Sequence, residues 1–207
     1  KRQVCTSMVA YTLSRRDFVL RKPFQLLFVV TMYVGGGMIP EYLLIIRTLK
    51  LGNNFMVYIL PGLMWVYNMI LVRSYIDGLP MALQEAAKLD GANDFQIWYK
   101  VVMPLCKPVI ATVGLYYAVG QWNSYFNALI YIRSESLQPL QIVLRSILVG
   151  NQTMSAMSTG AAAVEAKQMA DLIKYAIIVV SSAPIMCMYP LVQKYFNQGV
   201  MLGSLKG

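Results

Sequence analysis

The sequence contains no histidine among its 207 residues, and only 13% of them are charged. Without histidine, a catalytic triad built on histidine or a zinc site with histidine ligands is impossible within this chain. Its three cysteines, Cys5, Cys106 and Cys187, are far apart and match no spacing of a metal or redox motif. We expect them to be small apolar side chains in helices, and we expect no metal or other cofactor on this chain.

The sequence also lacks a glycine-rich loop followed by Lys and Ser or Thr, the motif that binds ATP phosphates in many ATPases. We therefore expect no ATP site and no catalytic residue in this chain. No secretory signal peptide is recognisable. Acidic residues are scarce, 9 against 18 Lys and Arg, but the basic residues form no stripe with interleaved aromatic side chains. Nucleic acid is therefore not an expected partner.

Hydrophobic residues are abundant, at 57% of the chain, and the mean hydropathy is +0.53. Soluble proteins carry about 25% charged residues, so this composition predicts an integral membrane protein in contact with lipid. Basic residues flank the apolar runs, as expected of loops that face an anionic inner leaflet. Four of them lie within residues 14–22, and this segment is predicted to be cytoplasmic.

Long apolar runs predict membrane spans near the roughly 20 residues that a bilayer core requires. The complete spans are predicted at 23–46, 54–76, 108–132 and 172–196. Residues 3–14 are too short to cross, and we expect them to be the end of a truncated first span that begins before Lys1. Three glycines at 35–37 predict a kink or break in the first complete span. The fold class expected is all-α, a polytopic transmembrane helical bundle in a single domain over 1–207.

The segments between the spans differ in length and in the side that they face. Residues 77–107 are polar and are predicted to be a cytoplasmic loop. Residues 133–171 are predicted to be a long outer loop, with a short amphipathic helix at 140–149 and an irregular loop at 151–160. The glycine-rich end, 199–207, is predicted to be a cytoplasmic tail.

Within the cytoplasmic loop, local signals predict two short helices joined at a glycine. Pro80 suits the start of a helix, because a first turn tolerates a missing N–H. Gly91 suits a left-handed cap at the end of that helix. Asn93 and Gln96, three residues apart, predict a capping box at the start of a second helix. The second helix carries one apolar face made of Ile97, Trp98, Val101 and Val102.

These residues resemble the EAA loop of the membrane subunits of binding-protein-dependent ABC importers. The match consists of Glu-Ala-Ala at 85–87, Gly91 four residues after Ala87, Val101, and the pair Met103–Pro104. It departs from the usual pattern with Val101 in place of isoleucine and Met103 in place of leucine. The alternative interpretation is an ordinary amphipathic helix-turn-helix. The resemblance implies that the loop docks on an ATPase through the coupling residues Glu85, Ala86, Ala87, Asp90, Gly91 and Pro104.

The predicted third span is too polar in its second half to face lipid. It contains Trp122, Asn123, Tyr125 and Asn127, and in a continuous helix the two asparagines would share a face. Aromatic rings beside amides suit the recognition of a sugar by stacking and hydrogen bonding. A seam between helices held by amides is the equally weighted alternative. Asn68, inside the second complete span, has the same two interpretations, with a hydrogen bond to a neighbouring helix preferred over a place in the substrate path.

The resemblance covers nearly the whole chain and is closest to the carbohydrate branch of the family, which includes maltose-type second permeases and alginate importers. It implies a type I importer permease in the bacterial cytoplasmic membrane that moves a sugar, an oligosaccharide by preference, through alternating access. The implied partners are a second permease, two ATPase subunits that bind ATP and Mg²⁺, and an extracytoplasmic sugar-binding protein. This chain is then a transport subunit and not an enzyme.

Two other functions remain as alternatives at this point. A permease for an amino acid or an anion would share the EAA loop, although an anion path would favour buried basic residues. A membrane-embedded enzyme would need ionisable groups at membrane depth. Glu41 and Arg73 are the candidates, and both lie near the ends of predicted spans.

Overall fold

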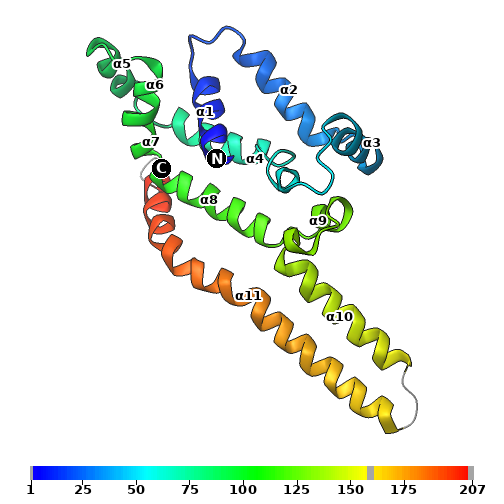
Figure 1. Cartoon of the computed structure of the whole chain (residues 1–207). Helices are drawn as coiled ribbons and strands as arrows, with labels where there is room; N and C mark the ends of the chain where they lie inside the picture. The colour runs from blue at the N-terminus through cyan, green and yellow to red at the C-terminus, as the bar shows by residue number, and fades with distance from the viewer. Residues whose placement is uncertain (1, 158–160, 205–207) are drawn as a thin grey trace. The chain divides into compact units, whose positions relative to one another are not determined.

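The computed structural model describes residues 2–157 and 161–204, and its regular elements there are all helices (Figure 1). The all-α prediction is therefore confirmed. The described residues form two compact units. The first unit contains residues 2–44, 59–118 and 192–204, and the second contains residues 45–58, 119–157 and 161–191.

The first unit contains most of the short helices of the chain. They are α1 (Arg2–Ser14), α2 (Arg21–Tyr33), α3 (Met38–Leu43), α4 (Val66–Asp77), α5 (Met81–Leu89), α6 (Asp94–Gln96), the π-helix η3 (Ile97–Val102), α7 (Met103–Leu105) and most of α8 (Lys107–Trp122). A second π-helix, η1 (Leu44–Thr48), leads into the second unit. Apolar residues at helical spacing give α1, α4, η3 and α8 one face each in a common core.

The core of the first unit is a cluster of buried side chains in which α1 packs against α4. Burial of apolar side chains is the main favourable term in packing helices against each other outside lipid contact. The cluster comprises Ala10, Tyr11 and Leu13 of α1, Met69, Val72 and Ile76 of α4, Ile97, Trp98 and Val102 of η3, Cys106, and Val113 and Tyr117 of α8. The second helix of the EAA loop is thus part of the core.

A chain of buried polar groups links three parts of this unit. The backbone N–H of Trp65, just before α4, donates to the Tyr117 hydroxyl at 3.0 Å. The Thr6 hydroxyl lies 2.8 Å from that hydroxyl and donates its own proton to the Arg2 carbonyl at 3.0 Å. Tyr117 therefore donates to Thr6. Because buried polar groups are costly unless they are paired, this arrangement fixes α1 relative to α8 and to the start of α4.

The second unit contains the 3₁₀ helix η2 (Phe55–Tyr58), α9 (Phe126–Tyr131), the 3₁₀ helix η4 (Glu135–Leu137), α10 (Leu140–Met157) and most of α11 (Ala161–Ser204). Within this unit α9 contacts η2. Figure 1 shows α11 running back in the direction opposite to α10. The Tyr58 hydroxyl donates to the Leu137 carbonyl at 3.0 Å and ties η2 to η4.

By length and composition, one described helix can cross a membrane, residues Ala163–Pro190. Up to three spans result if each of two bent helix pairs counts as one. These are Arg21–Tyr33 with Met38–Thr48, bent by 111°, and Asp94–Leu105 with Lys107–Trp122, bent by 85°. The break predicted at 35–37 is confirmed, and Gly37 has a φ of 84° there.

Two of the predicted spans are not continuous helices, so these two predictions are wrong. Residues 54–76 form the short 3₁₀ helix η2 and then an α-helix only from Val66 onward, because Pro61 has no N–H to donate and disfavours helical backbone at Leu60. Residues 108–132 are interrupted at 123–125. Asn and Ser side chains compete for backbone hydrogen bonds, and this polar segment is where the helix stops.

A third difference from the predictions concerns the segments that follow the third predicted span. Of the loop predicted at 151–160, residues 151–157 instead continue α10 to Met157, and residues 158–160 lie outside the described residues. Asn151 donates to the Ile147 carbonyl at 2.7 Å and Thr153 to the Val149 carbonyl at 2.9 Å, so these polar side chains bond within the helix. The predicted tail overlaps the last turns of α11 up to Ser204. Residues 205–207 lie outside the described residues.

Candidate functional site

The first helix of the EAA loop, α5, follows Pro80 and ends in a complete left-handed cap. Gly91 has a φ of 80°. Its N–H donates to the Lys88 carbonyl at 3.0 Å, and the Ala92 N–H donates to the Ala87 carbonyl at 3.0 Å. This pair of bonds satisfies two carbonyls that a helix end otherwise leaves free. The prediction of a glycine cap at position 91 is confirmed.

The second helix begins with the predicted capping box. The Asn93 side chain accepts from the Gln96 N–H at 2.8 Å, and the Gln96 side chain accepts from the Asn93 N–H at 3.0 Å. Asp94 follows in the first turn, where a negative charge is favoured by the helix dipole. A single residue, Ala92, therefore separates Gly91, which caps the first helix, from Asn93, which caps the second.

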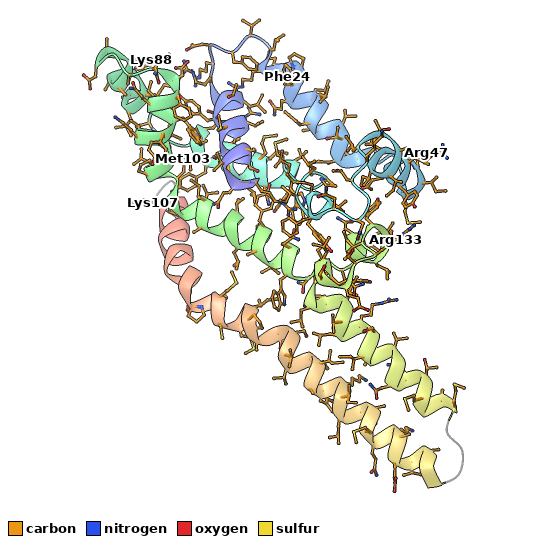
Figure 2. All side chains as sticks on the ribbon, viewed as in Figure 1. Phe24, Arg47, Lys88, Met103, Lys107 and Arg133 are labelled. Carbon is orange, nitrogen blue, oxygen red and sulfur yellow. The ribbon has the colours of Figure 1, made fainter. Side chains whose placement is uncertain are left out.

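The second helix changes to a π-turn and is buried on its predicted face. The Met103 N–H donates to the Trp98 carbonyl, five residues back. Pro104 has no N–H for the next helical bond, which accounts for the wider turn. Ile97 is fully buried, while Phe95 is 60% exposed on the outer face. Met103 begins α7, the last part of this helix, and Lys107 begins α8 (Figure 2).

The first helix is exposed on most of its surface. Glu85, Ala86 and Asp90 are all exposed, and Leu89 is 90% exposed. Only Ala87 packs against the core cluster of the first unit. An exposed leucine at a helix end that carries a carboxylate and small side chains is suited to contact another protein.

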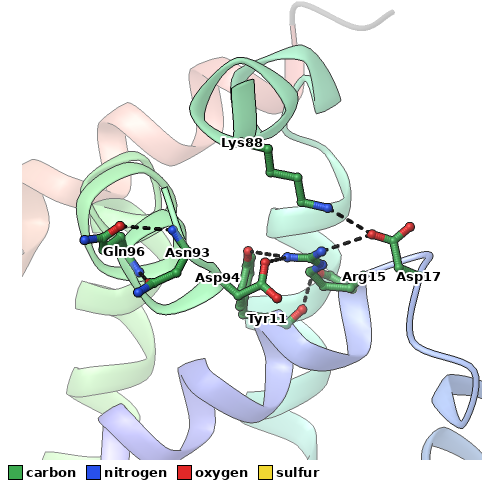
Figure 3. A network of polar contacts seen from close by, with 8 residues as sticks. Tyr11, Arg15, Asp17, Lys88, Asn93, Asp94 and Gln96 are labelled. Atoms are coloured by element: carbon green, nitrogen blue, oxygen red, sulfur yellow. Dashed lines mark hydrogen bonds and ion pairs between the residues drawn. The ribbon is translucent and has the colours of Figure 1, made fainter. Parts of the chain in front are cut away.

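A charged network holds this loop to the connection between α1 and α2 (Figure 3). It is not among the features predicted from the sequence. Arg15 donates to the carboxylate of Asp94 and, at 3.0 Å, to that of Asp17. Lys88 of α5 donates to the same Asp17 oxygen at 3.0 Å. Tyr11 accepts from Arg15 at 3.2 Å. The sequence feature that could have indicated this network is a single acidic residue, Asp17, in an otherwise basic connection.

The positive charges around Asp17 affect its protonation. Its hydrogen bond from Lys88, and then the one from Arg15, hold the pKa of the carboxyl group below its ordinary value. The carboxylate is therefore charged at neutral pH. A group with a lowered pKa contributes to the folded state above its ordinary pKa, and that contribution is lost as the pH falls through the lowered value.

The predicted substrate-path residues of the second unit lie at the helix break. The Trp122 indole N–H donates to the Ser181 carbonyl of α11 at 2.8 Å. Asn123 is exposed in the turn that ends α8, and Asn127 is half-buried in α9. The predicted shared face of the two asparagines is wrong, because the helix is not continuous between them. Their contact with a substrate stays a prediction.

Tyr125 and Asn68 are the remaining predicted substrate-path residues, and they belong to different units. Tyr125 is 41% exposed, and the Cζ atom of Arg145 lies 5.8 Å from the centre of its ring, within the range of a cation–π contact. Asn68 in the first unit is 1% exposed. Neither atom of its amide has a hydrogen-bond partner among the described residues, so the expected bond to a neighbouring helix is not found there. Its place in the path stays a prediction.

Asn53 organises a turn of the second unit from a left-handed conformation with a φ of 52°. Its side-chain oxygen accepts from the N–H groups of Arg133 and Ser134 at 3.1 and 2.9 Å. Its amide nitrogen donates to the Ser134 hydroxyl at 2.8 Å, and its backbone N–H donates to the Tyr131 carbonyl at 2.8 Å. One side chain thus joins two segments about 80 residues apart.

Replacing Asn53 with alanine is expected to lower the free energy of unfolding by about 1–2 kcal/mol, through lost hydrogen bonds and left-handed strain. Asn53→Gly removes the same bonds but tolerates the backbone, so it should cost less than alanine. Thermal unfolding midpoints of the two purified variants in detergent measure the difference. A midpoint for Asn53→Ala equal to that of the unaltered chain would contradict this assignment.

Among the described residues, no group of three His, Cys, Asp or Glu side chains could hold a metal ion. Cys5, Cys106 and Cys187 are all free thiols. In the first unit, the exposed helix α5 thus lies against the helix Asp94–Leu105, which is buried on one face.

Comparison with known proteins shows the family of the chain. The family of binding-protein-dependent transport system inner membrane components matches residues 4–202. The chain belongs to this family. The sequence is 41% identical over 206 residues to the polygalacturonan/rhamnogalacturonan transport system permease protein YtcP of Bacillus subtilis (strain 168), covering 98% of this chain and 70% of the relative. It is 38% identical over 203 residues to protein LplC of the same organism, covering 98% and 68%.

A solved structure is similar over most of the chain. It is the crystal structure of a bacterial ABC transporter involved in the import of the acidic polysaccharide alginate, with a TM-score of 0.77 and 35% sequence identity. The match covers 94% of this chain and 70% of that one. These findings confirm the importer-permease prediction, its fold class and its place in the inner membrane. The membrane-enzyme alternative has no support from them.

Proposed function

We propose that this chain is the permease subunit of an ABC importer for oligosaccharides and that its EAA loop docks on an ATPase partner. The observation that carries this proposal is the EAA helix pair, defined here as α5 and the helix Asp94–Leu105. Its first helix is exposed and its second is buried in the core. A force applied to α5 is therefore delivered to packed helices of the first unit.

The chemistry of ATP belongs to the partner in this proposal. The sequence has no P-loop motif, so ATP and Mg²⁺ are bound by two ATPase subunits. The exposed carboxylate of Glu85 pairs with a basic group on an ATPase, and Leu89 enters an apolar site beside it. A second permease completes the path, and an extracytoplasmic binding protein delivers the sugar to the outer segment 133–171.

The substrate class rests on the helix break and on the relatives. Relatives matched over 98% of this chain include the arabinooligosaccharides permease AraQ of Halalkalibacterium halodurans, which is 29% identical over 206 residues and is covered over 67% of its own length. At the break, Asn123 offers an exposed amide and Tyr125 an exposed ring. Arg145 beside that ring adds a positive charge. This set of groups suits an oligosaccharide with carboxylate groups better than an amino acid, which would require a site for an ammonium group.

The experiment reconstitutes the chain with its partner permease, ATPase and binding protein in proteoliposomes. We expect ATP-dependent uptake of an acidic oligosaccharide that exceeds uptake of a neutral one of the same length. The chain purified alone should hydrolyse no ATP. Hydrolysis by the isolated chain, or uptake of amino acids in preference to both sugars, would contradict the proposal.

A further inference from the structure

The connection Arg15–Arg16–Asp17 lies between α1 and α2 and contacts both helices of the EAA helix pair (Figure 3). Asp17 bonds Lys88 on α5, and Arg15 bonds Asp94 at the start of α6. The two helices are joined in sequence by the short link at Gly91, and α5 also contacts η3. Asp17 and Arg15 on the connection therefore bind one residue on each side of the Gly91 link.

Arg15 is suited to this role by its own surroundings. Its side chain is only 14% exposed, although its two carboxylate partners are 66% and 68% exposed. Tyr11, one turn earlier on α1, accepts a hydrogen bond from Arg15 and lies beneath the guanidinium, 5.8 Å from Cζ to the ring centre. The planar guanidinium can serve several acceptors at once, which a lysine ammonium does with less fixed geometry.

Charge is the main link between the connection and α5. A cavity of about 300 Å³ lies between them, and Arg15, Asp17, Glu85 and Lys88 are among its lining residues. Where a cavity separates two elements, apolar packing does little to hold them together. The ion pair between Asp17 and Lys88 is then the contact that ties α5 to the connection.

We propose that Arg15, Asp17, Lys88 and Asp94 form a charged clamp through which movement of the EAA helix pair reaches α1. This inference rests on the proposed function of the loop as the ATPase docking element. From α1 the movement passes to α4 through their shared core and to α8 through the hydrogen bond between Thr6 and Tyr117. Arg15 is a positioning residue in this scheme, because it acts through the loop and touches no substrate.

The clamp predicts a loss of coupling rather than a loss of docking, since the exposed face of α5 is unchanged when the clamp is broken. In the reconstituted importer, Arg15→Gln and Asp94→Asn should each raise the ATP hydrolysed per sugar imported by about two- to tenfold, as removal of exposed or half-buried ion pairs allows. The amount of ATPase that co-purifies should stay at the level of the unaltered complex.

Two matched variants complete the test. Asp94→Glu keeps the carboxylate and should restore the ratio of ATP to sugar, whereas a purely steric role of Asp94 would not. Arg16→Gln removes an exposed neighbouring charge that lies outside the network and should leave the ratio unchanged. If Arg15→Gln reduces the membrane level, Asp94→Asn carries the test, because that carboxylate is on the surface.

The clamp proposal is overturned if the Arg15→Gln and Asp94→Asn importers both hydrolyse as much ATP per imported sugar as the unaltered importer. It is also overturned if Arg16→Gln raises this ratio as much as they do. Failure of the proposed function gives a different result. In that case the unaltered chain itself recruits no ATPase and imports no sugar.

Discussion

Replacing Gly91 with valine is expected to reduce sugar uptake by tenfold or more, or about 1.4 kcal/mol in coupling, while the chain still inserts in the membrane. Gly91 has a φ of 80°, and a β-branched residue is strongly disfavoured there. A Cβ atom built at this position meets no atom within 4 Å, so the penalty is one of backbone conformation alone. Relief of that strain requires the link to rotate, which breaks the cap bonds to Lys88 and Ala87.

The measurement compares uptake, co-purified ATPase and membrane level for Gly91→Val and Gly91→Asn. Asparagine tolerates left-handed backbone better than other side chains and fits the open space, so it should keep most of the uptake. A valine variant that transports as well as the asparagine variant would mean that the angle between the two helices has no part in coupling.

The EAA helix pair could be predicted from the sequence because its signals are local. The glycine cap and the capping box each depend on residues within five positions of one another, and both are present. The burial of Ile97, Trp98 and Val102 followed from helical spacing alone. Short-range hydrogen bonds and a single face of a helix need no knowledge of the remaining chain.

The clamp could not be predicted because its partners are distant in sequence. Arg15 and Asp94 are 79 residues apart, and Asp17 and Lys88 are 71 apart. Basic residues near a membrane span usually indicate only the side of the membrane, and Arg15 was interpreted in that way. Nothing in the local pattern separates a charge that faces solvent from one that bonds a second loop.

The helix boundaries of the second unit were missed for a different reason. Hydropathy identifies an apolar run but does not reveal where the backbone leaves the helix within it. The polar segment 123–125 was recognised as unusual, yet it was assigned to one continuous helix. The structure ends α8 at Trp122 and begins α9 at Phe126. A break at membrane depth is tolerated where the backbone lines a cavity or is covered by protein, and such breaks often mark the substrate site of a transporter.

Substitution of Asn123 by alanine is expected to reduce oligosaccharide uptake by about tenfold, because removal of an amide that bonds a substrate hydroxyl leaves that hydroxyl unpaired. The side chain is exposed at the break, so its loss should not impair folding or assembly. Trp122→Ala should instead lower the membrane level, since its indole N–H bonds the Ser181 carbonyl of α11 and its ring is half-buried.

The matched control is Gln121→Ala, which removes an exposed amide in the last turn of α8 and should leave transport unchanged. Uptake, complex assembly and membrane level are measured for all three variants. If Asn123→Ala reduces assembly as much as Trp122→Ala does, the amides form a seam between helices. If it transports like Gln121→Ala, the substrate does not pass this break.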